Sequence, residues 1–109
     1  MKEYVIIPFQ VQEDKIDEAK KIINELISNV RAKEKGTLLY ESLQMKKDQT
    51  SFIHFIIFAN HDAHIEHRSA IYVIDFVRKL YDLCQREPFP IFLDHFDSCG
   101  IAVEALEQK

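Results

Sequence analysis

The segment that most constrains the fold is Ser51–Ala59, with the sequence SFIHFIIFA, which is apolar at nearly every position. Its length and its aromatic and β-branched residues predict a β-strand. Successive side chains of a strand point to opposite faces of the sheet, so both faces of this strand are apolar and both must be covered. His54 is the only polar side chain inside the run. One face carries Phe52, His54, Ile56 and Phe58, and the other carries Ile53, Phe55 and Ile57.

The residues before this strand predict a first strand and a long helix. Tyr4–Val11 alternates with strand period, and Pro8 indicates a bulge or an unpaired position because proline has no N–H to donate. Apolar residues then recur at helical spacing up to Gly36, which we expect to end the helix. Asp14 is the predicted N-cap of this helix, with Asp17 as its capping-box partner.

The remaining segments complete an alternating order of strands and helices. The sequence predicts a second strand at Thr37–Met45 and a hairpin turn at Lys46–Gln49, which leads into the apolar strand. A second amphipathic helix is predicted at Asp62–Gln85, and a proline-containing break follows at Glu87–Pro90. The last strand is predicted at Ile91–Phe96 and, after an interruption, at Ile101–Val103. The order β-α-β-β-α-β predicts an α+β protein with a ferredoxin-like fold, in which residues 1–109 form a single domain. Its helices cover one face of the sheet, so the second apolar face predicts a homodimer joined sheet to sheet.

Composition argues against several classes of partner. The formal net charge is −4 and no segment concentrates Lys and Arg, so we expect no nucleic-acid partner. No run approaches the ~20 apolar residues of a membrane span, and no small-residue cleavage site follows the N-terminus. We therefore expect no membrane association and a cytoplasmic location. Cys84 and Cys99 lack CxxC spacing and are expected to be reduced.

Three histidines, His61, His64 and His67, follow the apolar strand at intervals of three residues. On a helix they spread over about 120°, because each step of three residues falls about 60° short of a full turn. The sequence has no HExxH motif and no cysteine near them, so the pattern predicts no metal site. We expect His61 and His64 to be exposed residues at the start of the second helix.

Two stretches, KGTLLYE (Lys35–Glu41) and SFIHFIIFANHDAHIEH (Ser51–His67), together resemble the antibiotic biosynthesis monooxygenase (ABM) family of dimeric α+β barrels. The family pattern is a Gly-x-Leu-x-Tyr-Glu strand, an aromatic-aliphatic strand ending in Trp, a short acidic turn, and a helix that begins Ala-x-x-x-His. The matching residues are Gly36, Leu38, Tyr40, Glu41, Ala63 and His67. The resemblance extends from Tyr4 to Phe96 and implies the same dimeric fold for this chain.

The sequence departs from the family pattern at three positions. Phe58 replaces the Trp that usually ends the third strand, Ile56 replaces a frequent Glu, and Tyr72 stands where a second His often follows. Relatives include cofactor-free quinol oxygenases, haem-degrading enzymes and an isomerase of a phosphorylated signalling sugar, so the fold does not decide the reaction. The haem-degrading branch fits least, because Ile7 stands where its members carry Asn and no His lies near Phe76.

The resemblance also implies a cavity between the sheet and the helices, with His67 pointing into it. A neutral imidazole with a pKa of ~6.5 suits removal of a proton from an acidic hydroxyl, so His67 is the expected catalytic base. Its alternative role is a hydrogen bond to the backbone near the helix start. We expect further ligand contacts from His54, Phe58, Ile56, Tyr40 and Tyr72. Tyr40 and Glu41 point to opposite faces of their strand, so only one of them can reach the cavity.

Three functions are compatible with these residues. The first is a cofactor-independent monooxygenase that acts on a small electron-rich aromatic, such as a quinol, in an apolar pocket. The second is a non-oxidative isomerase of a small carbonyl compound, for which His54 and His67 are the available acid–base pair. The third is a dimer that binds a small molecule without catalysis. None of the three requires a cofactor, and we expect none.

Overall fold

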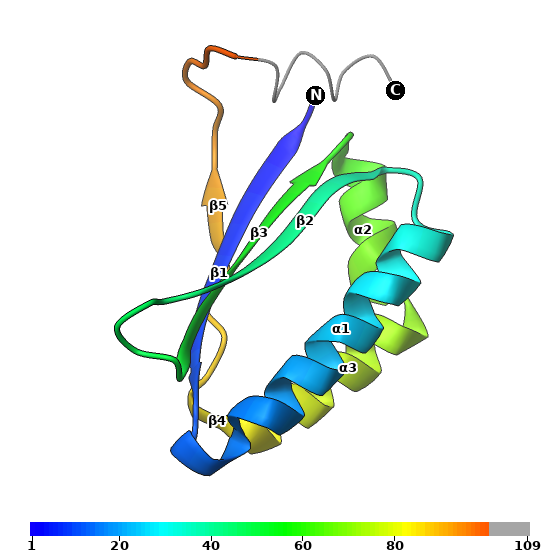
Figure 1. The fold of residues 1–109 in the computed structure, drawn as a ribbon. Helices are drawn as coiled ribbons and strands as arrows, with labels where there is room; N and C mark the ends of the chain where they lie inside the picture. The colour runs from blue at the N-terminus through cyan, green and yellow to red at the C-terminus, as the bar shows by residue number, and fades with distance from the viewer. Residues whose placement is uncertain (101–109) are drawn as a thin grey trace.

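The computed structural model describes residues 1–100 of the chain (Figure 1). Its elements are β1 (Glu3–Val11), a 3₁₀ turn η1 (Glu13–Lys15), α1 (Ile16–Lys33), β2 (Thr37–Gln44), β3 (Ser51–Phe58), α2 (His61–Ser69), α3 (Ile71–Leu83), β4 (Cys84–Arg86) and β5 (Ile91–Leu93). The predicted strand segment at Ile101–Val103 lies outside the described residues. None of the helices within residues 1–100 is long and apolar enough to span a membrane.

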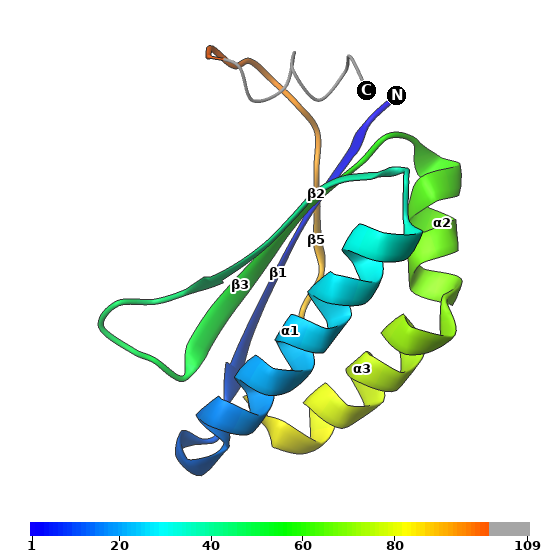
Figure 2. The same ribbon diagram turned by 45° about the vertical axis from the view of Figure 1, so that its right-hand side comes forward.

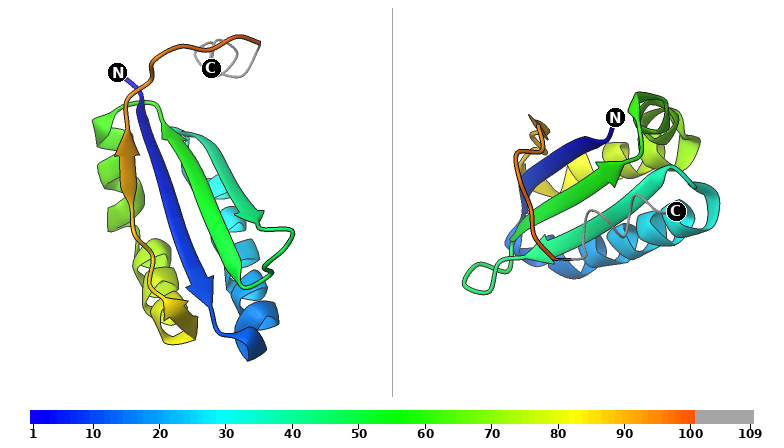
Figure 3. Two further views of the ribbon diagram at one scale, coloured as in Figure 1. Left: turned by 90° about the vertical axis from the view of Figure 1, so that its left-hand side faces the viewer. Right: turned by 90° about the horizontal axis from the view of Figure 1, so that it is seen from above.

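The strands form one antiparallel sheet in the order β2-β3-β1-β4, and β5 also pairs with β1. Along one edge of β1 runs β3, from the pair Glu3↔Phe58 to the pair Gln10↔Ser51. The other edge of β1 pairs with β5 near its start and with β4 near its end. All three α-helices lie on one face of this sheet (Figures 1 and 2), and the opposite face carries no helix from the described part of the chain (Figure 3). This is the predicted ferredoxin-like α+β fold.

Pro8 pairs with Ile53 of β3 on one edge of β1 and has no strand partner on the other edge, where its missing N–H would have pointed. On the edge shared by β4 and β5, it falls between the residues paired with β5 and those paired with β4. Its carbonyl faces the same edge and accepts the N–H of Phe89 at 3.1 Å. The bulge of β1 lies further along, between Gln10 and Val11. The proline therefore costs the sheet no ladder hydrogen bond.

The core lies between the sheet and the helices. Apolar residues recur along α1 and α3 at the three- and four-residue spacing of amphipathic helices. The buried members are Ala19, Ile23, Leu26 and Val30 of α1 and Val73, Phe76, Leu80 and Leu83 of α3. The face of β3 toward them is buried throughout, whereas Ile53 and Phe55 on the uncovered face are half-buried.

The predicted single helix over Asp62–Gln85 is wrong, because it is two helices separated at Ala70. The backbone of Ala70 is extended, with φ −67° and ψ 138°, and its N–H donates to the carbonyl of His67. No proline or glycine marks this break in the sequence. Its effect is directional: on a continuous helix, side chains five residues apart point about 140° away from each other. The break instead allows His67 of α2 and Tyr72 of α3 to reach the same partner, described below.

The predicted start of the first helix is also wrong. Asp14 lies within η1, and the residue that precedes α1 is Lys15, whose side chain makes no capping hydrogen bond. At the other end, Glu34 is the C-cap of α1 and donates its N–H to the carbonyl of Val30. Gly36 does follow the helix, but it has no left-handed φ. Its role is spatial, because a Cβ at Gly36 would lie 2.5 Å from the Cβ of Ala63.

The chain after α3 differs from the prediction in two ways. The backbone becomes extended at Cys84, where β4 begins and pairs with Val11 of β1, so the helix ends earlier than its apolar pattern suggested. β5 covers only Ile91–Leu93, and residues 94–100 form no strand. The segment 87–90, which contains two prolines, separates β4 from β5 as expected.

Candidate functional site

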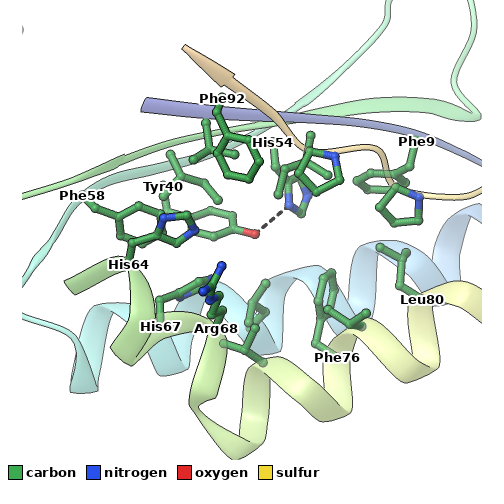
Figure 4. Close-up of a pocket in the computed structure, with 18 residues that line it drawn as sticks. Phe9, Tyr40, His54, Phe58, His64, His67, Arg68, Phe76, Leu80 and Phe92 are labelled. Atoms are coloured by element: carbon green, nitrogen blue, oxygen red, sulfur yellow. Dashed lines mark hydrogen bonds between the residues drawn. The ribbon is translucent and has the colours of Figure 1, made fainter. Parts of the chain in front are cut away.

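A cavity of about 220 Å³ lies between the sheet and the helices α2 and α3 (Figure 4). This is below the ~300–1,000 Å³ typical of pockets for drug-sized ligands, so the cavity suits a small ligand. Its walls are mainly aliphatic and aromatic. The polar side chains that line it are Arg68, Tyr40, His54, His64 and His67.

His54 of β3 is buried, with 2% of its surface exposed, and lies in the wall of the cavity. Its Nδ1 lies 2.7 Å from the hydroxyl oxygen of Tyr40, whereas its Nε2 is buried and has no hydrogen-bond partner within residues 1–100. Burial lowers the pKa of His54 to about 4 and raises the pKa of Tyr40 above its ordinary value. At neutral pH the pair is therefore an uncharged imidazole beside an uncharged phenol.

The partner of each nitrogen defines the tautomer of His54. If the Tyr40 hydroxyl donates to Nδ1, the proton of His54 resides on Nε2 and a single buried donor stays unpaired. In the reverse arrangement, Nδ1–H would donate to Tyr40, and both the phenolic hydrogen and Nε2 would lack partners. Unpaired buried polar groups are costly, so the first arrangement is preferred. His54 thus lies in the cavity wall with a buried, unpaired Nε2–H donor.

His67 of α2 is also buried, with 6% of its surface exposed, and its ring lines the same cavity. Its Nδ1 lies 2.8 and 3.0 Å from the two carboxylate oxygens of Glu34. Burial lowers the pKa of His67, and the Glu34 carboxylate raises it in partial compensation. A neutral His67 donates Nδ1–H to this carboxylate, which leaves Nε2 as an acceptor with no partner among the described residues.

Glu34 is held by three side chains and is itself buried, with 5% of its side chain exposed. Besides His67, the hydroxyl of Tyr72 donates to Oε2 and the hydroxyl of Thr37 donates to Oε1, both at 2.5 Å. Hydrogen bonds to an ionised carboxylate are among the stronger ones in proteins. Glu34 therefore orients the His67 ring through its Nδ1. Sequence reasoning missed Glu34, and the only local signal was an acidic residue two positions before Gly36, where the helix was expected to end.

The structure brings most of the predicted site residues together. Tyr40 and not Glu41 reaches the cavity, and its ring centroid lies 5.2 Å from that of His54 and 5.8 Å from that of His67. Ile56 and Phe58 form part of the apolar wall. Tyr72 lies outside this cavity, because its hydroxyl turns to Glu34. Among apolar side chains, the cavity is therefore lined by one imidazole with an unpaired acceptor nitrogen, His67, and one with a buried, unpaired N–H donor, His54.

Of the other two histidines, His64 lines the cavity near the start of α2, whereas His61 lies outside it. His61 is exposed, as predicted, but only 11% of the His64 side chain is exposed, so that expectation is wrong. The reason is packing: the His64 ring stacks on Phe58, with centroids 4.6 Å apart and an interplanar angle of 8°. The imidazole rings of His61 and His64 both hydrogen-bond to Glu3 of β1.

Comparison with known proteins assigns the chain to a family. The antibiotic biosynthesis monooxygenase profile matches residues 4–79. The chain belongs to this family, as its sequence resemblance implied. No curated protein matches significantly.

Solved structures share the fold at low sequence identity. A Caulobacter crescentus protein named for the same family superposes with a TM-score of 0.82 at 23% identity, covering 88% of this chain and 91% of its own. Rv0793 of Mycobacterium tuberculosis superposes with a TM-score of 0.83 at 19% identity, covering 92% of this chain and 100% of its own. A protein of Pseudomonas aeruginosa superposes with a TM-score of 0.79 at 19% identity, covering 88% of this chain and 95% of its own.

Proposed function

We propose that this protein is a cofactor-independent monooxygenase that oxidises a small, electron-rich, quinol-like aromatic. The observation that carries the proposal is His67: a neutral imidazole, buried beside an apolar cavity, with Nδ1 held by Glu34 and Nε2 free to accept a proton. A general base must reach the proton that it removes and must be unprotonated at the working pH. The lowered pKa of His67 satisfies the second condition.

The chemistry assigned to the residues starts with a hydroxyl of the substrate. His67 Nε2 takes the hydroxyl proton, and His54 Nε2–H donates a hydrogen bond to an oxygen of the resulting anion. The anion passes one electron to O₂, and the radical pair combines to form a C–O bond. The resulting peroxide anion takes the proton back from His67, and the hydroperoxide loses water to leave a carbonyl. One oxygen atom of O₂ enters the product and the other leaves in water. The apolar walls, including Phe58, exclude solvent from the intermediates.

The opposite tautomers of the two histidines support a substrate with two oxygen atoms. Because His67 accepts and His54 donates, a hydroxyl and a second acceptor oxygen on one flat ring system satisfy both. A substrate of this kind also pairs the Nε2–H of His54, which otherwise stays buried without a partner. The substitution of Phe58 for the usual Trp keeps an aromatic surface for the ring to contact.

The test is oxygen consumption with a panel of quinols and anthrone-like phenols. We expect turnover by the wild type and a ~10²–10⁴-fold lower kcat for His67→Ala, the usual cost of losing a general base. Glu34→Gln should lower kcat with little change in KM, because Glu34 orients His67 without contacting the substrate. His95→Ala is the matched control, since His95 is exposed and lies outside the cavity. Absence of turnover by the wild type, or equal rates for wild type and His67→Ala, would contradict the proposal.

A second candidate is an isomerase of a small carbonyl compound. The observation that favours it is the same donor–acceptor pair, because an enolisation needs one group to remove a proton and another to hydrogen-bond the carbonyl. Exchange of a substrate C–H with deuterated water, without oxygen uptake, would select this function. If both assays are negative while a small molecule co-purifies with the protein, the chain is a binding protein that does not catalyse a reaction.

The proposal includes a cytoplasmic homodimer. The uncovered face of the sheet, shown in Figure 3, supports the dimer, since half-buried Ile53 and Phe55 and half-exposed Leu43 lie on it. Cys84 and Cys99 are both free, which is typical of proteins in a reducing compartment.

A further inference from the structure

A second polar cluster lies where β1 and α2 begin, at one end of the cavity. The carboxylate of Glu3 faces two imidazoles: Oε2 lies 2.9 Å from His61 Nδ1, and Oε1 lies 2.7 Å from His64 Nδ1. One ligand atom of each residue lies within 4.8 Å of the other two. The chemistry proposed above uses none of these three side chains.

We propose that Glu3, His61 and His64 bind one divalent transition-metal ion of the zinc type. Zinc binds imidazole nitrogen and carboxylate oxygen at ~2.0–2.2 Å, which places neighbouring ligand atoms of a tetrahedral or octahedral shell ~3 Å apart. The two N···O separations already have nearly this value. A metal ion can therefore replace the two N···O hydrogen bonds of the cluster, since its three ligand atoms all lie within 4.8 Å of one another.

The donor atoms select the class of metal. Two imidazole nitrogens and one carboxylate oxygen suit Zn²⁺ and its first-row neighbours, whereas Mg²⁺ and Ca²⁺ prefer oxygen ligands alone. The site lies at the N-terminus of α2, where the helix dipole opposes a cation. The negative charge of Glu3, with that of Asp62 in the first turn of α2, offsets this effect.

The elements that carry the ligands hold them in place. Asn60 caps α2 by accepting the N–H of Ala63 at 2.8 Å, which fixes the first helical turn with His61 and His64 on it. The stacking of His64 on Phe58 restrains its ring. His61 is the outermost ligand, with 65% of its side chain exposed. The metal ion then joins β1 to α2 beside the cavity that His64 lines.

This proposal departs from the sequence-based expectation of no metal, because that expectation considered only the histidines and the residues close to them in the sequence. His67 turns inward to Glu34 and takes no part. The third ligand is Glu3, which lies 58 residues before His61 in the chain and becomes its neighbour only when β1 pairs with β3.

The experiment is titration of chelator-treated, dialysed protein with ZnCl₂ by calorimetry, and with CoCl₂ by visible absorption. We expect one ion per chain for the wild type and for the control His95→Ala. Affinity should fall at least ~100-fold in His61→Ala and in Glu3→Gln, since even the loss of a supporting outer-shell contact commonly costs 10–100-fold. The exposed His61 can be removed without opening the core, so this variant decides the result if Glu3→Gln fails to fold.

Two results would overturn the proposal. One is the absence of stoichiometric Zn²⁺ binding by the wild type at micromolar concentrations. The other is Zn²⁺ binding that His61→Ala leaves unchanged, which would indicate a different site on the surface. Neither result depends on oxygen consumption, so this test is separate from that of the proposed reaction.

Discussion

At the scale of single residues, the groups behind the two cavity histidines give them different chemistry. Tyr40 is an uncharged phenol that donates to His54, whereas Glu34 is a carboxylate that accepts from His67. Strand alternation and the family pattern located both histidines in the sequence. Neither could locate Glu34, which is 33 residues before His67 in the chain and has no periodic relation to it. Side-chain partners of this kind depend on how elements pack, and hydrophobic spacing does not encode them.

The buried His54 predicts a loss of stability in acid. Its pKa is about 4 in the folded protein, and an unfolded histidine has a pKa of ~6.5. Between these values the unfolded chain binds more protons, so the free energy of unfolding falls as the pH drops from ~6.5 towards 4. The difference of roughly 2.5 pKa units corresponds to about 3 kcal/mol. Urea denaturation of the wild type at a series of pH values from 7 to 4 measures it.

The matched comparison is the double variant Tyr40→Phe/His54→Phe, which removes the titrating group together with its partner. Its free energy of unfolding should decline less between pH 7 and pH 4, by about the same 3 kcal/mol. His67, Glu34 and the surface carboxylates are unchanged in both proteins, so their contributions cancel. Parallel pH profiles for the two proteins would show that His54 is not the group responsible.

At the scale of elements, periodicity predicted the strands and helices well and their ends less well. The apolar alternation of β3 and the helical spacing in α1 gave the right elements. The break at Ala70 was missed because the apolar stripe continues through it into α3, and no proline or glycine interrupts the sequence. The end of α3 was missed because pairing with Val11 draws Cys84 into the sheet. In both cases tertiary contacts outweigh local preference.

Close packing between the start of β2 and the start of α2 predicts a cost for Gly36→Ala. The added Cβ would meet the Cβ of Ala63 at 2.5 Å, so one backbone must shift. Overpacking of this kind typically costs ~1–3 kcal/mol, which chemical denaturation resolves. The double variant Gly36→Ala/Ala63→Gly should recover stability beyond additivity, although glycine in a helix itself costs ~1 kcal/mol. Strict additivity would mean that the two positions do not touch.

At the scale of the whole molecule, the uncovered sheet face predicts a dimer. A specific interface buries ~800 Å² per partner, and the apolar side chains on this face are suited to one. Light scattering should give twice the 12.9 kDa mass of the chain at micromolar concentration. Phe55→Asp should shift the equilibrium towards monomer. Ile74→Asp is the control, because Ile74 is 41% exposed but lies on α3, on the opposite side of the sheet.

A monomeric wild type at this concentration would contradict the dimer. An equal effect of Phe55→Asp and Ile74→Asp would show that the apolar sheet face is not the contact surface. Dimerisation is also a separate question from the chemistry of the cavity, because every residue assigned to that chemistry comes from a single chain.

The central place of β1 has a consequence for synthesis on the ribosome. β1 is translated before all of its partners, which are β5 and β4 on one edge and β3 on the other. Its edges therefore have no partner until β3 has emerged, and the β5 edge waits until residue 93. α1 can form early from local contacts. Nascent chains of this protein therefore expose an apolar strand with free edges until these partners emerge, and we expect chaperones that shield such strands to bind them.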